Sequence, residues 1–143
     1  YVASGATTTT ISTWRVTDHA TDVFHDRLGM DKAYRVETDC STFAVEIHTT
    51  YLAEVHDGDE VYVTTQLLDH DEKRLHYFHR MYHAEKGFLS ATNEIMTVHV
   101  DLGARKVVPM HAGIRERAGA MFEVHQELPA PDQQGHTIGI RRK

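Results

Sequence analysis

The chain has 143 residues, of which 41% are hydrophobic and 25% are charged, a composition typical of one soluble globular domain. Its net charge of −6 argues against general binding to nucleic acid, because such binding needs a basic face toward the phosphates. Cys40 is the single cysteine, and no membrane-length apolar run or secretory leader is evident, so we expect a cytoplasmic protein without disulfides.

The first long element predicted along the chain is a helix. It follows a small, polar stretch at 1–13, YVASGATTTTIST, which contains no acid, base or histidine. From Trp14 to Leu28 the apolar residues recur at helical spacing, namely Val16, Ala20, Val23, Phe24 and Leu28. Asp18, Asp22 and Asp26 fall four apart on another face, which we interpret as exposed to solvent.

A run of strands follows, because after Tyr34 the apolar pattern changes to period two. Short turns rich in Asp, Gly and Lys separate four expected strands, at Phe43 toward Val55, Val61–Leu67, Arg74–His83 and Phe88–Val100. A second helix is expected at Ile114–His125. The pattern predicts an α+β fold, with one domain at 1–128 and a Pro-containing tail at 129–143.

A homodimer is expected from the same pattern. One long helix cannot cover both faces of a four-stranded antiparallel sheet, and an exposed face or edge invites pairing with a second copy.

Several segments together resemble one family, the hotdog-fold acyl-CoA thioesterases related to 4-hydroxybenzoyl-CoA thioesterase. They are DHATDVFHDRLGM, TFAVEIHTTYL, GDEVYVTTQLL, DEKRLHYFHRMYH and LSATNEIMTVHVD. With its ending MFEVHQELPAPDQQG, the chain is most similar to the branch that hydrolyses betainyl-CoA in carnitine breakdown.

The resemblance implies a fold and a set of partners. The fold is a sheet wrapped around one central helix, with an additional C-terminal helix and a first strand that is short or missing here. The partners are an acyl-CoA substrate and a second copy, in a homodimer with a continuous sheet or a tetramer. No metal and no cofactor is implied beyond the coenzyme A of the substrate.

The resemblance also implies a catalytic loop ahead of the helix, with a motif like W-V-D-Y-N-G-H-M-N whose aspartate is the base or nucleophile. Here the aspartate position is Ala3, and we expect Ser4, Gly5, Thr7 and Thr8 to contact the substrate, partly through backbone N–H groups. Three explanations stay open. The residues are misread or substituted in this sequence, another residue supplies the base, or the chain binds acyl-CoA without hydrolysing it.

Glu46 is the strongest remaining candidate for an acid or base, with His48 two residues away on the same strand face. The structural alternative is a glutamate satisfied by hydrogen bonds. Trp14 and Tyr51 are candidate aromatic walls for the quaternary ammonium of a betainyl group, although Trp14 also suits helix packing.

Lys73, Arg74 and Arg80 are the candidates for contacts with the phosphates of CoA, with plain solubility as the alternative. The chain has 12 histidines, several of them on the strand at Arg74–His83. They fall on both faces of that strand without a matching carboxylate pattern, so we expect hydrogen-bonded or solvated histidines more than a metal site.

Overall fold

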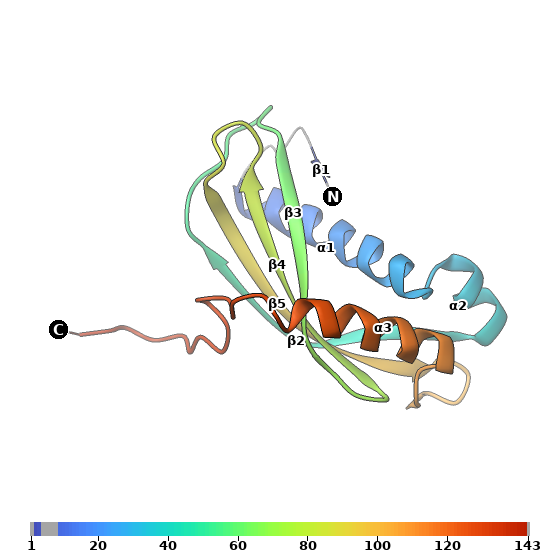
Figure 1. Cartoon of the computed structure of the whole chain (residues 1–143). Helices are drawn as coiled ribbons and strands as arrows, with labels where there is room; N and C mark the ends of the chain where they lie inside the picture. Colours follow the sequence, from blue (N-terminus) through green and yellow to red (C-terminus); the bar gives the residue numbers. More distant parts are fainter. Residues whose placement is uncertain (1, 4–8, 143) are drawn as a thin grey trace.

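The computed structural model describes residues 2–3 and 9–142, which form an antiparallel sheet with a long helix lying along it (Figure 1). In chain order the described elements are β1 (Val2–Ala3), α1 (Thr9–Leu28), α2 (Lys32–Thr38), β2 (Cys40–Tyr51), β3 (Val61–His70), β4 (Arg74–His83), β5 (Leu89–Asp101), β6 (Lys106–Val107) and α3 (Ala112–His125). The strand order is β1-β3-β4-β5-β2, with β6 paired to β5. The predicted α+β class, the long helix and the C-terminal helix are confirmed.

Helix α1 is held against the sheet by its apolar stripe, which is buried in two clusters. Val16 and Ala20 pack with Met81 and neighbouring valines, and one to two turns further on Phe24 and Leu28 join a second cluster around the strand centres. Each large apolar side chain buried in this way contributes roughly 1.5–3 kcal/mol. The helix is therefore fixed in rotation, which determines which of its residues face the rest of the sheet.

Helix α3 packs against β3 and shares the second cluster with α1 through Ile114 and Ala118 (Figure 1). Its last residue, His125, accepts a hydrogen bond at Nδ1 from the Leu67 N–H at 2.8 Å. Leu67 lies beyond the short stretch of β3 that pairs with β1, so its N–H on the open side of the strand is satisfied by a side chain.

Helix α2 is the element that the hydrophobic pattern missed. Asp31 accepts a hydrogen bond from the Tyr34 N–H at 2.9 Å at its start, and Asp39 ends it in the left-handed region with a φ of 52°. None of the side chains in α2 is buried. A short helix set by its caps carries no apolar stripe to detect.

Strand β2 contains a bulge that corrects the expected facing of its residues. The pairing with β5 shifts between Ala44 and Glu46, so side chains before and after that point change face. The sequence pattern places Ala44 with Glu46 and His48, whereas the structure places Ala44 with Ile47 toward α1. Among the described strands, nothing pairs with the other edge of β2.

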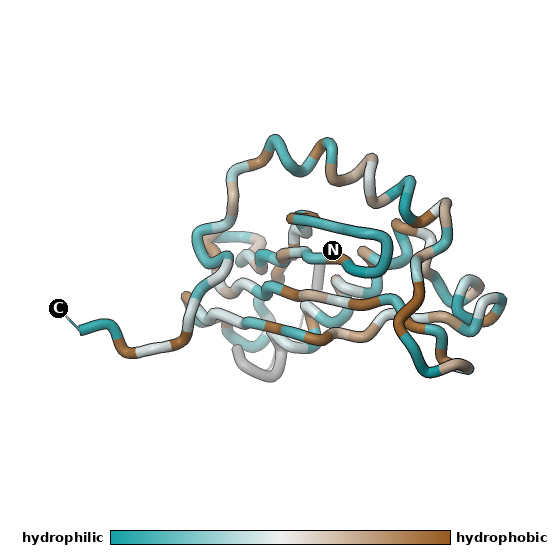
Figure 2. The backbone as a smooth tube through the Cα atoms, turned by 90° about the horizontal axis from the view of Figure 1, so that it is seen from below, coloured by the Kyte–Doolittle hydropathy of each residue, from teal (hydrophilic) through white to brown (hydrophobic). Residues whose placement is uncertain are grey.

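The tail after α3 runs across the face of the sheet opposite α1. Gln66 donates to the Pro129 carbonyl at 3.4 Å, the Gly135 N–H donates to a Glu94 carboxylate oxygen at 2.9 Å, and the His136 ring lies 5.7 Å from that of His48. The final residues leave the body of the domain and carry exposed apolar positions (Figures 1 and 2).

Candidate active site

A cavity of about 310 Å³ lies between α1 and the sheet, on the side toward β2. Its walls come from α1, α2 and three strands. The lining residues are Trp14, Thr17, Asp18, Thr21, Asp22, His25, Arg35, Ser41, Thr42, Ala44, Ile47, Tyr77, Asn93, Ile95 and Thr97. The cavity exists because α1 packs over β3 and β4, which leaves the inner surface of β5 and β2 without a helix above it.

The deep part of this cavity is polar. Four of its buried side chains each carry an atom that has no hydrogen-bond partner among the described residues, namely His25 Nε2, Tyr77 Oη, Asn93 Oδ1 and Thr97 Oγ1. Buried polar atoms are nearly always paired, so several unpaired atoms around one cavity indicate a place for a polar ligand.

His25 is held neutral by its surroundings. Its Nδ1 lies 3.3 Å from the Thr42 hydroxyl, and burial followed by the positive charge of Arg35 lowers its pKa to about 4. The Tyr77 ring meets the His25 ring edge-on at 5.8 Å, and burial raises the pKa of Tyr77. Both groups are therefore uncharged at neutral pH.

One stripe of α1 carries an aromatic ring and two acids along the cavity. Trp14 is 56% exposed and is followed four and eight residues later by Asp18 and Asp22, both exposed. Asp18 and Asp22 are exposed, as the sequence predicts, but the sequence pattern did not predict that they also line a cavity. The signal was the spacing of Trp14, Asp18, Asp22 and His25, which share one side of a helix.

Of the residues predicted from the sequence, Trp14 lines the cavity, whereas Glu46, His48 and Tyr51 do not. Glu46 is exposed, and His48 lies beside the tail on the opposite face of the sheet, because the bulge reverses the facing of β2. Tyr51 is 46% exposed at the end of β2. The structure thus separates the predicted acid and base from the cavity.

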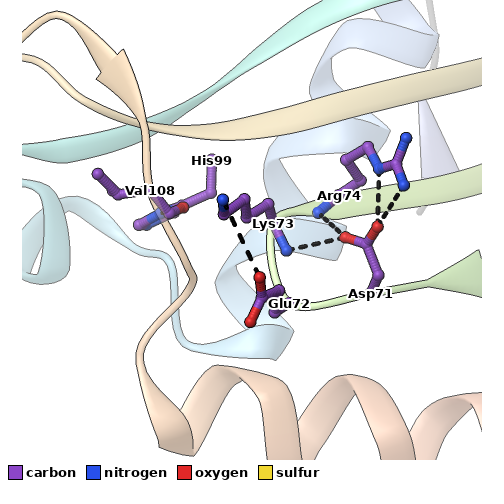
Figure 3. Close-up of polar contacts among 6 residues, drawn as sticks. All are labelled: Asp71, Glu72, Lys73, Arg74, His99 and Val108. Atoms are coloured by element: carbon purple, nitrogen blue, oxygen red, sulfur yellow. Dashed lines mark hydrogen bonds and ion pairs between the residues drawn. The ribbon is translucent and has the colours of Figure 1, made fainter.

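The predicted CoA-binding cations lie in two places, of which Figure 3 shows the turn that carries Lys73 and Arg74. In the turn before β4, Asp71 accepts from the N–H groups of Lys73 and Arg74, and its carboxylate pairs with the Arg74 guanidinium at 2.6 Å, which holds the pKa of Asp71 low. Arg80 lies about 20 Å further along β4, where it donates to Gln66 at 3.0 Å. The three cations do not form one cluster.

The predicted substrate-binding residues Ser4, Gly5, Thr7 and Thr8 lie outside the described residues. The backbone of Ala3, where the family resemblance places an aspartate, pairs with Val61 at the edge of the sheet.

Each histidine of β4 has its own polar partners. His76 contacts Glu94 at 2.8 Å, His79 lies between the hydroxyls of Thr21 and Thr65, and His83 approaches Asp59 at 3.3 Å. Within residues 2–3 and 9–142, no group of three metal-ligating side chains gathers. Helices in the same part of the chain are too short or too polar to cross a bilayer.

The antiparallel sheet in the order β1-β3-β4-β5-β2 around one long helix is the arrangement of the hotdog fold. Residues 9–118 match the family model of the Thioesterase-like superfamily, and the chain belongs to that superfamily.

Two relatives in sequence are named for one substrate. A betainyl-CoA thioesterase of Pseudomonas aeruginosa is 38% identical over 125 residues, which cover 87% of this chain and 79% of that protein. An L-carnitine dehydrogenase/betainyl-CoA thioesterase of Rhizobium meliloti is 42% identical over 115 residues, which cover 80% of this chain and 23% of that longer protein.

Two solved structures share the fold over nearly the whole chain. A putative thioesterase of Pseudomonas putida KT2440 superposes with a TM-score of 0.83 at 28% identity, covering 99% of this chain and 96% of that chain. A Staphylococcus aureus protein solved in complex with CoA gives a TM-score of 0.89 at 24% identity, covering 99% and 95% of the two chains.

Proposed function

We propose that this chain hydrolyses a small acyl-CoA thioester, with betainyl-CoA as its preferred substrate, to the free acid and CoA. The observation that carries the proposal is the cavity beside α1, which is lined by Trp14 and, one and two helical turns further along, by Asp18 and Asp22. The relatives named for betainyl-CoA support the choice of substrate.

The chemistry of the cavity suits a quaternary ammonium group. Such a group has no N–H to donate, so a protein holds it through aromatic faces and negative charge. Trp14 offers a ring that is more than half exposed, and Asp18 lies four residues later, one helical turn along the same side of α1. Cation–π attraction alone is worth roughly 0.5–2 kcal/mol, or about 2- to 30-fold in affinity.

Asp22 is our candidate for the general base. The family's usual aspartate position is Ala3, and Glu46 lies away from the cavity, so Asp18 and Asp22 are the acids that line it among the described residues. Asp22 lies nearer to the polar floor, three residues before His25. Water attacks the carbonyl carbon and gives a proton to Asp22, the C–S bond breaks, and the CoA thiolate takes up the proton.

We further propose that the chain works as a homodimer through β2. This strand has 12 residues and exposes Phe43, Val45 and Ile47, with 54%, 59% and 43% of their surfaces accessible. A second copy pairing along this edge would extend the sheet and cover the apolar side chains. It would also close the cavity, because Ile47 belongs to the cavity wall.

Some expectations remain predictions within this proposal. These are CoA contacts by Lys73, Arg74 and Arg80, substrate contacts by Tyr51 and by Ser4, Gly5, Thr7 and Thr8, association into a tetramer, and the absence of a cofactor other than the CoA of the substrate. Catalysis by Glu46 and His48 also stays an untested prediction, to which Asp22 is the alternative that we propose. A cytoplasmic location also remains a prediction, in keeping with a CoA substrate and a single free thiol, Cys40, which is buried.

A second candidate function is binding of acyl-CoA without turnover, which Ala3 favours because a methyl group cannot activate water. A matched substrate pair separates the two functions. Betainyl-CoA and 3,3-dimethylbutyryl-CoA have the same shape, and only the first carries a positive charge.

We expect thiol release from both substrates, with a higher kcat/KM for betainyl-CoA. Trp14→Leu and Asp18→Asn should lower that preference about 10-fold while sparing the neutral substrate. Asp22→Asn should lower kcat for both substrates by 100-fold or more, within the roughly 10²–10⁴-fold that general-base catalysis supplies. Equal rates on both substrates would contradict the cation site, and binding without thiol release would favour the second function.

A further inference from the structure

Two residues with unpaired polar atoms at the floor of the cavity come from different elements and have neighbouring rings. His25 is on α1, Tyr77 is on β4, and their rings meet edge-on with centroids 5.8 Å apart. The side chains are 7% and 0% exposed, and both line the cavity. His25 Nε2 and Tyr77 Oη have no hydrogen-bond partner among the described residues.

Both atoms can donate a hydrogen bond. When the Thr42 hydroxyl donates to His25 Nδ1, which lies 3.3 Å away, the ring proton is on Nε2. The low pKa of His25 and the raised pKa of Tyr77 keep the imidazole and the phenol neutral at neutral pH. The Thr21 hydroxyl makes a loose approach to Tyr77 that counteracts part of the rise in the Tyr77 pKa. It is bonded to His79 Nε2 at 2.9 Å, however, and its approach to Tyr77 Oη does not meet the usual distance and angle limits of a hydrogen bond. The pair is thus a buried, uncharged set of donors.

We propose that the Nε2–H of His25 and the hydroxyl of Tyr77 bind the carbonyl oxygen of the thioester and stabilise the oxyanion formed when water attacks. This inference rests on the proposed hydrolysis. As the water oxygen bonds to the carbonyl carbon, the C=O electron pair moves onto the oxygen that the two donors hold. The pair returns as the C–S bond breaks, and the electrons of that bond leave with the CoA sulfur.

The chemistry of a betainyl group assigns its parts to the two regions of the cavity. Its ammonium accepts no hydrogen bonds and suits Trp14 and Asp18, whereas its carbonyl oxygen is a strong acceptor and suits the floor. One methylene separates the nitrogen from the carbonyl carbon, whereas Asp18 and His25 start about 10 Å apart along the helix axis. The Asp18 side chain must therefore reach along the cavity toward the floor for one betainyl group to meet both regions. Asp22 comes between them along the helix, about 4.5 Å along the axis from His25, where a base for the attacking water is needed.

Neutral donors in a buried site are well suited to this role. They need not reorganise when charge develops, and water does not screen them, so removal of one such donor typically lowers kcat about 10²–10³-fold. A donor that merely binds the ground state would change KM instead.

Tyr77→Phe is the cleanest test because it removes the hydroxyl and keeps the ring, which packs on Phe24 with centroids 4.6 Å apart. We expect kcat for betainyl-CoA to fall about 100-fold, with KM changed less than about threefold. Tyr62→Phe is the matched control, because Tyr62 stacks on Tyr82 and does not line the cavity. It should leave both constants unchanged.

A binding measurement separates failure of this inference from failure of the proposed hydrolysis. Two unreactive analogues are compared, a ketone that keeps the carbonyl oxygen and a thioether that lacks it. Tyr77→Phe and His25→Leu should weaken the ketone analogue several-fold and leave the thioether unchanged.

If the parent releases no thiol, the proposed hydrolysis fails, and the analogues alone decide the inference. If the parent is active and Tyr77→Phe matches it in kcat and in ketone binding, the floor holds only solvent and the inference is overturned. Equal weakening of both analogues by Tyr77→Phe would also overturn it, because the hydroxyl would then act on packing and not on the carbonyl oxygen.

Discussion

Two buried histidines, His25 and His79, should make the free energy of unfolding fall steeply between pH 7 and pH 5. Burial lowers their pKa values to about 4 and about 3, from about 6.5 in the unfolded chain. Below pH 6.5 the unfolded chain takes up protons at both rings, while the folded chain does not. Stability is therefore complete above pH 6.5 and is lost as the pH falls toward the folded-state values.

The size of the loss in the free energy of unfolding follows from the folded and unfolded pKa values of the two histidines. Each ring contributes about 1.4 kcal/mol per pH unit below 6.5, so the two together should remove roughly 3–4 kcal/mol between pH 7 and pH 5. His99 and His125 have lowered pKa values for the same reason and act in the same direction. The lowered pKa values of Asp59 and Asp71 act only below their ordinary value of 3.8, outside this window.

The assay is urea unfolding at pH 7 and pH 5, at one fixed protein concentration. His79→Gln cannot take up a proton and should retain only about half of the pH-dependent loss, whereas His56→Gln, at an exposed turn, should retain all of it. A parent protein whose free energy of unfolding changes by less than about 1 kcal/mol between the two pH values would refute the reasoning.

Two further predictions concern the edge and the tail. Val45→Lys places a charge on the exposed edge of β2, so the sedimentation coefficient should fall to that of a monomer, and an unchanged dimer would show that another surface associates. Glu94→Gln removes the charge that holds His76 at 2.8 Å and the Gly135 N–H at 2.9 Å, so limited proteolysis should cut the tail several-fold faster. Equal cleavage of parent and variant would mean that the tail is held elsewhere.

The periodic elements of this fold could be predicted from sequence because burial repeats along them. Helix α1, the four long strands and α3 each carry an apolar stripe, and the pattern predicts β4, β5 and α3 to within two residues of their observed bounds. Helix α1 begins five residues before the predicted Trp14, and β2 spans Cys40–Tyr51 and not Phe43 toward Val55. Helix α2 has no buried side chain, and local hydrogen bonds at Asp31 and Asp39 set its ends. A hydrophobic pattern therefore does not predict this helix.

The site was harder to predict for two physical reasons. The bulge between Ala44 and Glu46 reverses the facing of β2, which a strict period of two cannot express, and it turns Glu46 away from the cavity. Asp18 and Asp22 look solvated because they are exposed, and only the open side of the sheet across from them makes their stripe part of a cavity.

The most direct test of the central claim is thiol release by the purified parent protein with betainyl-CoA, beside the neutral 3,3-dimethylbutyryl-CoA and the Ala3→Asp variant. We predict turnover by the parent with a clear preference for betainyl-CoA, and a fall in turnover of about 100-fold or more on both substrates in Asp22→Asn. A parent that binds betainyl-CoA but releases no thiol, together with an active Ala3→Asp variant, would contradict the account, because the base would then belong at position 3 and not on α1.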